Sequence, residues 1–329
     1  MEQSKENILT ILRNTNTSDR TKIAFSFEPF TKPDSIHGMV IGNDLDSVVS
    51  ACFLKSLFGW DVAAIYDYKM LWYSATEKDF LARFSNGDYV AIDLDVYHPN
   101  IFSLGHHILE SAPSDVLAGH ARSLNPNFIR GINVSNFKRK YPLGTIHFLV
   151  WLFNQTDLTR AAKFTMWLAD SAFINAQSHR FRENALEWAR DYFQSGYLLN
   201  MTERVDLPGF EEALQKEIFP ALKNNPLASN SGQVKSRHFD LSGYQCQWSD
   251  PNRERESIAE LFQIVSALTS WTAPHLPNQF LKVEGKRQKI TADEIAKRFG
   301  TLDKFLSDEK VFSYVFPYRD SVNYTNGIA

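Results

Sequence analysis

Four groups of acidic and histidine residues in the first half of the sequence could hold divalent metal ions. The groups are Asp44 with Asp46, then Asp93, then the pair His106-His107, and finally Asp170. Three of the groups follow an apolar run, so a strand or a buried helix would deliver them to a common rim of the fold. Carboxylate oxygens supplemented by a few imidazoles suit hard divalent ions. The pattern therefore predicts metal-dependent chemistry.

The aspartates Asp44 and Asp46 lie two positions apart, directly after the apolar run 39–41. In extended chain this spacing puts both side chains on the same side. Two carboxylates held close together repel each other and are costly to bury, and bound cations would relieve both penalties. The alternative is that Asp46 caps the following helix while Asp44 is a solvated turn residue.

The other groups also have ordinary structural alternatives. Asp93 closes an apolar run, and Asp95 beside it could be a ligand, a supporting residue or a surface residue. Neighbouring histidines point in different directions, so one of His106 and His107 could bind metal while the other faces a substrate; a surface pair is the alternative. Asp170 follows an apolar helical run and could instead cap a helix or accept an internal hydrogen bond. The order of the four groups, more than any one of them, favours a metal site.

The segments around these residues predict an α/β fold. Short apolar strands alternate with helices, with strands expected at 38–42, 61–66 and 89–92 and helices at 47–58 and 76–84. This alternation implies right-handed crossovers and a parallel sheet. Ligands bind such sheets at the carboxyl ends of the strands, where Asp44 and Asp93 are expected to lie. We therefore predict a doubly wound parallel sheet with a second, smaller α+β domain.

The remaining chain is predicted to be helical up to about residue 200 and mixed beyond it. Helices are expected at 141–153, 158–176 and 182–199, and then at 210–223, 254–268 and 292–308, with strands at 234–248 and 280–284. Three parts follow from this organisation: an N-terminal helix and arm at 1–37, a metal-binding catalytic domain at 38–200, and a C-terminal α+β domain at 201–329 that would bind substrate or cap the site.

Composition and charge disfavour several classes of function. Hydrophobic residues make up 43% of the 329 residues and charged residues 22%, as in a globular protein with a substantial core. A formal net charge of −3 argues against binding long duplex nucleic acid. The isolated Cys52 and Cys246 disfavour a disulfide scaffold and a structural zinc site. Since the sequence shows neither a signal-peptide pattern nor an apolar run long enough to span a bilayer, we expect a cytoplasmic protein with no membrane partner.

Phosphate binding would require positive charge near the predicted rim. Arg122 and Arg130 follow the histidine pair and could each hold phosphate oxygens with two hydrogen bonds, although plain surface positions explain them equally well. We predict Arg122 as a catalytic and substrate-binding residue, and Arg130 and Asn125 as substrate-binding residues. The basic triplet 138–140 is interpreted as a solvated face. The dipeptide Gly144-Thr145 could open a helix whose N-terminus binds an anion.

In their order and spacing, the four groups resemble the motifs of the DHH phosphoesterase superfamily over about residues 38–175. Asp44-Leu45-Asp46-Ser47 is similar to the first motif, Ile92-Asp93 to the second, Gly105-His106-His107 to the third and Asp170 to the fourth. The third motif has glycine at position 105 instead of aspartate, and Asn43 precedes the first motif, where a histidine is often found upstream. The superfamily includes single-strand exonucleases, oligonucleotide and cyclic-dinucleotide phosphodiesterases, exopolyphosphatases and manganese-dependent pyrophosphatases.

The resemblance implies a role for each of these residues. Asp93 would bridge two metal ions, and Asp44 would complete the shell of one of them. Asp46, His106 and Asp170 would bind the other ion, and His107 would contact the scissile phosphate. The oxygen-rich ligand set favours two Mn²⁺ ions, with Mg²⁺ as the alternative. Such a pair, about 3.5–4 Å apart, activates a bridging water for hydrolysis.

The leading hypothesis is a metal-dependent phosphohydrolase that cleaves a phosphodiester or phosphoanhydride in a small phosphorylated molecule or a short, including cyclic, oligonucleotide. The rival hypothesis is a DHH-like nucleotide- or phosphate-binding module that has lost catalysis and acts as a sensor, sequestering or partner-binding protein. Gly105 favours this rival. The G-x-S-x-G pattern of serine hydrolases and the G-x-G-x-x-G pattern of Rossmann enzymes do not occur in the sequence. A homodimer is left open.

Overall fold

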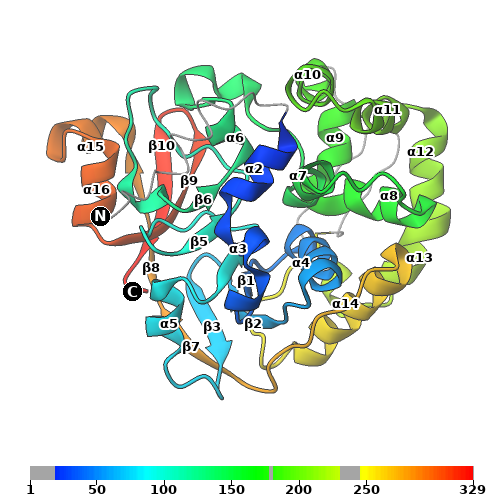
Figure 1. Ribbon diagram of the computed structural model, residues 1–329, viewed down its shortest axis with the longest axis horizontal. Coiled ribbons are helices and arrows are strands. Elements are labelled where there is room, and N and C mark those ends of the chain that lie inside the picture. The colour runs from blue at the N-terminus through cyan, green and yellow to red at the C-terminus, as the bar shows by residue number, and fades with distance from the viewer. Residues whose placement is uncertain (1–18, 178–180, 230–244, 329) are drawn as a thin grey trace.

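The computed structural model describes residues 19–177, 181–229 and 245–328. These residues form a mixed α/β fold with one large sheet and one small sheet (Figure 1). The strands of the large sheet are Met39–Ile41 (β1), Val62–Tyr66 (β2), Met70–Ser74 (β3), Val90–Ile92 (β4), Phe102–Leu104 (β5), Ser123–Leu124 (β6) and Phe280–Glu284 (β7). They lie side by side in the order β6-β5-β4-β1-β2-β3-β7.

The large sheet is mostly parallel. The strands from β6 to β2 run parallel to one another, whereas β3 and β7 pair in antiparallel fashion at the other edge. The predicted parallel sheet is therefore confirmed for the strands that precede the aspartates, but the hairpin from β2 to β3 was not expected. The chain passes from β1 to β2 on one side and later returns to place β4 on the other side of β1, so the strand order reverses between β1 and β4. Ligands bind parallel sheets at such a reversal.

Helices connect the central strands and cover the sheet. Helix α4 (Leu45–Phe58) links β1 to β2 and ends at Gly59, whose φ of 76° provides the left-handed turn that closes a helix. Helix α5 (Phe80–Asn86) leads into β4 and starts four residues later than predicted. The strands β1, β4 and β5 are buried at every position, because side chains on both faces of the sheet enter a hydrophobic core.

A helical layer packs against α4, to the right of the sheet in Figure 1. It contains α7 (Thr145–Leu152), α8 (Arg160–Leu168), α9 (Ala172–Gln177), α10 (Arg182–Glu187), η5 (Trp188–Tyr192), α11 (Gly196–Val205), α12 (Pro208–Ala213), η6 (Leu214–Ile218), α13 (Phe219–Leu222) and α14 (Arg255–Thr269). The helix predicted at 158–176 is broken at Asp170, whose backbone has φ of 49°. The domain boundary predicted at 200/201 falls inside α11.

Shorter helical segments occupy the N-terminal arm and the connections between the larger elements. They are α2 (Arg20–Ser26), α3 (Glu28–Thr31), η1 (Pro33–Ser35), η2 (Ala118–His120), α6 (Pro126–Ile129), η3 (Val134–Arg139), η4 (Ala169–Ser171) and η7 (Pro226–Ser229). Within the described ranges, every helix is too short or too polar to cross a membrane.

The C-terminal region contributes to both sheets. After β7 joins the large sheet, the chain forms the antiparallel sheet β8-β10-β9, from Lys286–Thr291 (β8), Val311–Tyr318 (β9) and Ser321–Asn326 (β10), with α15 (Ala292–Arg298) and α16 (Leu302–Asp308) beside it. These three strands were not predicted, and the helix expected at 292–308 is two helices separated by Gly300. Most of the strand predicted at 234–248, and the helix predicted at 5–13, lie outside the described residues.

Candidate metal centre

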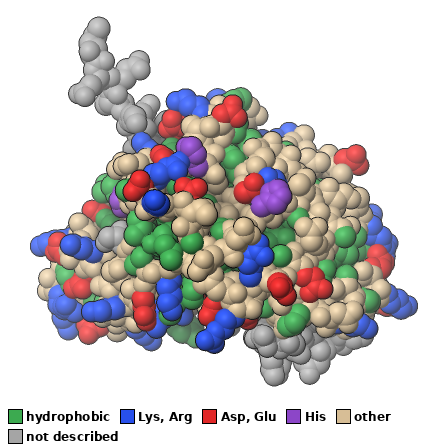
Figure 2. All heavy atoms as spheres, turned by 90° about the horizontal axis from the view of Figure 1, so that it is seen from below, with side chains coloured by type: hydrophobic (Ala, Val, Ile, Leu, Met, Phe, Trp, Pro, Cys, Tyr) green, Lys and Arg blue, Asp and Glu red, His purple; other side chains and the backbone are tan. Residues whose placement is uncertain are grey.

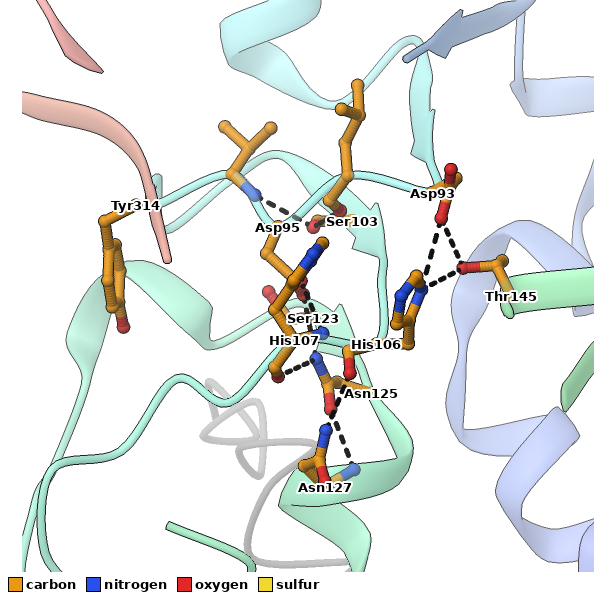
Figure 3. Close-up of polar contacts among 12 residues, drawn as sticks. Asp93, Asp95, Ser103, His106, His107, Ser123, Asn125, Asn127, Thr145 and Tyr314 are labelled. Carbon is orange, nitrogen blue, oxygen red and sulfur yellow. Dashed lines mark hydrogen bonds and ion pairs between the residues drawn. The ribbon is translucent and has the colours of Figure 1, made fainter. Parts of the chain in front are cut away.

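The residues predicted to bind metal converge at the carboxyl edge of the large sheet. Strand β1 ends at Ile41, β4 at Ile92 and β5 at Leu104, and these three residues are aligned in neighbouring strands. Asp93 comes directly after β4 and His106 two residues after the end of β5, so the two side chains lie side by side (Figure 3). The site therefore lies where the strand order reverses.

Three side chains at the centre of the site are joined by polar contacts (Figure 3). Thr145 Oγ1 donates a hydrogen bond to Asp93 Oδ1 at 2.7 Å and lies 2.8 Å from His106 Nδ1. His106 Nδ1 is also 3.2 Å from the same oxygen of Asp93. Ser47 Oγ donates to the other oxygen of Asp93 at 2.8 Å. Asp93 has φ of 58°, a conformation that is unfavourable for a non-glycine residue, so these contacts must hold it in place.

Asp46 lies in the first turn of α4 but caps a different helix. Its Oδ2 accepts the N–H of Thr145 at 2.6 Å and its Oδ1 accepts the N–H of Ile146 at 3.1 Å. These groups open α7, whose own N-cap residue, Gly144, has no side chain to offer. A Cβ atom at position 144 would lie 2.5 Å from Asp46 Oδ2, so glycine is required there. The anion site predicted at this helix terminus is present, and a carboxylate of the protein itself occupies it.

Asp44 is the N-cap residue of α4, where its Oδ1 accepts the N–H of Ser47 at 3.1 Å. The structural alternative, in which Asp46 caps α4 and Asp44 is a solvated turn residue, is therefore wrong in both parts, because Asp44 caps α4 and the buried Asp46 caps α7. Burial and the charges of Asp93 and Asp170 raise the pKa of Asp44 well above its ordinary value. An ionised carboxylate at this position is therefore unfavourable unless a cation lies nearby.

Asp170 approaches the centre from the helical layer. Its Oδ2 lies 2.6 Å from Nε2 of His106. Burial opposes the charged form of both groups, but their attraction prevails: the Asp170 and Asp93 carboxylates raise the pKa of His106 well above 6.5, and His106 lowers the pKa of Asp170 to about 2.

Asp46, Asp93 and His106 form a group that could hold a metal ion. One ligand atom from each lies within 4.8 Å of the others, and all three side chains are buried. Burial and the charges of Asp93 and Asp170 raise the pKa of Asp46 well above its ordinary value. Because crowded buried carboxylates are costly without a compensating charge, the donor set fits a divalent cation with a preference for oxygen ligands.

His107 is fixed beside this group by Asp95. The Oδ2 atom of Asp95 accepts the backbone N–H of His107 at 3.1 Å and lies 3.2 Å from Nδ1 of its ring. The pKa of Asp95 is lowered despite its burial, because His107 and Asn125 hydrogen-bond to the ionised form. Since an ionised carboxylate only accepts hydrogen bonds, we assign the proton to Nδ1, which leaves Nε2 for a ligand. His107 lines a pocket beside the metal centre.

Asp95 also explains why position 105 is glycine. A Cβ atom on Gly105 would lie 2.4 Å from the Asp95 carboxylate, which fills the space where a longer side chain would stand. A carboxylate is thus present next to His107, and it comes from the residues after β4 instead of from position 105. The sequence left the role of Asp95 open, and the structure shows a buried residue that supports His107.

The two arginines predicted to bind substrate are not among the residues that line the pocket. Arg122 precedes β6, at the amino-terminal edge of the sheet, where its Nη1 donates to Asn100 O at 3.2 Å and its guanidinium covers the ring of Phe102. Arg130 packs over the ring of Tyr192 at 3.5 Å. The structure therefore does not bring either arginine to the pocket lining, and their substrate-binding roles, with the catalytic role of Arg122, stay predictions.

Asn125 also has a different role from the predicted one. It is fully buried, and its Nδ2 donates to Asp95 Oδ1 at 2.9 Å and to His107 O at 3.0 Å. It therefore supports the histidine pair instead of binding substrate. Sequence reasoning missed two other residues at the site. Thr145 was noticed only through the helix it opens. Lys140 is exposed, as the interpretation of 138–140 as a solvated face requires, and it also lines the pocket.

Comparison of the chain with protein-family models, curated proteins and solved structures finds no match. The DHH-like interpretation therefore remains a resemblance of motifs. The support for a function comes from the site itself, which combines a buried Asp-Asp-His group, two further carboxylates and an adjoining pocket.

Proposed function

We propose that this protein is a divalent-metal-dependent hydrolase that cleaves a phosphodiester or phosphoanhydride in a small phosphorylated molecule or a short, including cyclic, oligonucleotide. The observation that carries the proposal is the buried group Asp46, Asp93 and His106 at the carboxyl edge of the sheet, where the strand order reverses. A cluster this rich in carboxylates is unfavourable by itself, and the motif resemblance to DHH phosphoesterases accounts for its composition.

Each residue has a definite task in this proposal. Asp46, Asp93 and His106 would hold one ion, and Asp44 would join Asp93 in holding a second. Asp170 lies at Nε2 of His106, across the ring from Asp93 at Nδ1, and would orient the imidazole. Mn²⁺ or Mg²⁺ suits such oxygen-rich sites, and these ions supply Lewis acidity and lower the pKa of water. His107, with Nδ1–H donated to Asp95, would face the substrate with Nε2, which must carry a proton of its own to donate a hydrogen bond to a phosphoryl oxygen.

A small substrate fits the surface better than a long nucleic acid does. The formal net charge is −3, and acidic and basic side chains are interspersed on the face drawn in Figure 2. Proteins that bind long nucleic acids commonly collect Lys and Arg on one face. Neither of the two buried cysteines, Cys52 and Cys246, takes part in a disulfide, which suits a reducing compartment such as the cytoplasm.

The experiment is an activity screen with Mn²⁺ and with Mg²⁺. Pyrophosphate, polyphosphate, linear dinucleotides and cyclic dinucleotides are offered to the purified protein, and the products are separated by ion-exchange chromatography. We expect cleavage of at least one of them, with kcat reduced by at least about 100-fold in Asp93→Asn, because a ligand of the ion is lost. The matched control is Asp88→Asn at the opposite end of β4, where the carboxylate pairs with Arg83 at 2.9 Å. Absence of cleavage of every substrate, or equal loss in both variants, would contradict the proposal.

The rival function is a phosphate- or nucleotide-binding module without catalysis. One observation favours it: both oxygens of Asp46 already accept N–H groups of α7, and among the described residues a single three-ligand group meets the distance criterion for a metal. Metal stoichiometry separates the two functions. Two Mn²⁺ ions bound per chain support the hydrolase, whereas one ion or none, with phosphate binding but no cleavage, supports the module.

A further inference from the structure

A pocket of about 170 Å³ lies next to the metal centre. His106, His107 and Asp170 form one wall, and the segment from Phe137 to Leu143 forms much of the rest. Its volume is below the range of about 300–1,000 Å³ typical of sites that enclose drug-sized ligands. The pocket therefore suits a compact chemical group that touches the metal centre on one side.

Lys140 is the one Lys or Arg among the described residues that line this pocket. Its surroundings lower the pKa of its ammonium group by hindering hydration, while the carboxylate of Asp170 acts in the opposite direction. Its Nζ also lies 5.2 Å from the centre of the Phe137 ring. The residues of the basic triplet 138–140 have different surroundings. Arg139 pairs with Glu187 on α10, whereas Lys140 is the member of the triplet that lines the pocket.

Both polar atoms of the peptide bond that follows Lys140 are held by hydrogen bonds. Asn184 Nδ2 donates to Lys140 O at 2.8 Å. The next residue, Tyr141, donates its N–H to Asn127 Oδ1 at 2.8 Å, and Asn127 in turn donates its Nδ2 to His106 O at 2.7 Å. The backbone next to Lys140 is therefore joined to the backbone of His106 through the side chain of Asn127, which fixes the point from which the Lys140 side chain extends.

The charges in the pocket indicate what it binds. When a divalent cation neutralises the carboxylates of the metal centre, Lys140 remains as a positively charged hydrogen-bond donor that faces a small volume. An oxyanion of the size of phosphate would satisfy it, since an ammonium binds phosphate oxygens as a compact point charge. We propose that this pocket is an anion subsite in which Lys140 binds a phosphate group of the substrate, an inference that rests on the proposed phosphohydrolase function.

The test measures binding separately from cleavage. The affinities of inorganic phosphate and of methylenediphosphonate, which is not hydrolysed, are measured by calorimetry with Mn²⁺-loaded protein. Lys140→Met keeps most of the side-chain length and removes the charge, and we expect it to weaken both affinities by about 10-fold or more. Lys140→Arg should restore part of the affinity. The matched control Lys138→Met, two residues away and outside the pocket lining, should leave both affinities unchanged.

Mn²⁺ affinity is measured for each variant in the same way and is expected to be unchanged, which shows that the metal centre has remained intact. Equal binding of methylenediphosphonate by wild type and Lys140→Met would overturn the proposal, as would failure of the wild type to bind either probe. If the wild type binds phosphate through Lys140 but cleaves no substrate, the anion subsite stands and the hydrolase fails. If it cleaves substrate and Lys140→Met is neutral, the hydrolase stands and the subsite fails.

Discussion

The Asp95 carboxylate determines the orientation of His107 and the identity of residue 105. It is buried, it accepts hydrogen bonds from His107 and Asn125, and it lies where the Cβ of any larger residue at 105 would have to be. This sequence has glycine at position 105, where the Asp-His-His motif has aspartate. The carboxylate next to His107 is instead that of Asp95, which follows β4. The glycine at position 105 is therefore only a weak argument for the rival, non-catalytic function.

Gly105→Ala tests this packing relation. The added methyl group would lie 2.4 Å from the Asp95 carboxylate, and we expect the free energy of unfolding, measured by urea denaturation, to fall by ~1–3 kcal/mol. In an Asp95→Ala background the same substitution should cost much less, because the clash is removed, and the double-mutant cycle measures this coupling. Gly196→Ala is the control, since a Cβ there meets no atom within 4 Å. Equal losses from Gly105→Ala in the two backgrounds would show that Asp95 is not the obstacle.

Helix α7 holds the ligand-bearing segments together. Its first residue, Thr145, donates its N–H to Asp46 on α4 and its hydroxyl to Asp93 after β4, and it contacts His106 after β5. The positions of the aspartates could be predicted from the sequence, because an apolar run followed by a carboxylate indicates the end of a buried strand. The contribution of Thr145 could not, since it depends on pairing with residues 99 and 52 positions away, for which the local sequence contains no signal.

The same reasoning explains the strands that the sequence did not reveal. The hairpin between β9 and β10 turns at Arg319-Asp320, without the Asn-Gly or Asp-Gly pair that announces a tight hairpin. β8 is exposed at most positions and therefore lacks a clear apolar alternation. In both cases pairing with a neighbouring strand, and not local pattern, decides the structure. The small antiparallel sheet could not be predicted because β8 is charged and mostly exposed. The antiparallel pairing of β3 with β7 could not be predicted because the two strands are far apart along the chain.

Thr145→Val tests whether α7 organises the site. Valine keeps the branched shape but removes the hydroxyl that contacts Asp93 and His106, so we expect the free energy of unfolding to fall by ~1–3 kcal/mol. Mn²⁺ affinity, measured by calorimetry, should weaken by about 10-fold or more, as for other residues that orient metal ligands. Thr145→Ser restores the hydroxyl and should recover most of both losses. If valine and serine at this position give the same Mn²⁺ affinity, the hydroxyl does not position the ligands.

The molecule as a whole carries a concentration of buried acid at one edge of its sheet, and this should make its stability depend on pH and on metal. In the folded state the pKa values of Asp44 and Asp46 are raised above 3.8, and that of His106 is raised above 6.5. Without metal, the folded state therefore holds more protons than the unfolded state above these ordinary values, so raising the pH favours unfolding. Asp170, with a pKa lowered to about 2, acts in the opposite sense, but only as the pH falls below 3.8.

We therefore expect the melting temperature of the protein in EDTA to decrease between about pH 5 and pH 8. Mn²⁺ binds the deprotonated ligands, so the rise in melting temperature that it produces should grow over the same interval.

Asp44→Asn removes one buried charge while keeping an equally good N-cap for α4, so it should raise the melting temperature in EDTA at pH 8 and reduce the shift caused by Mn²⁺. Asp19→Asn is the matched control, because Asp19 caps α2 at a position where the pKa is lowered. It should give neither effect. A melting temperature in EDTA that increases up to pH 8, or an Asp44→Asn variant that melts below the wild type there, would mean that the clustered carboxylates are not a source of instability and would remove the main physical reason for placing a cation among them.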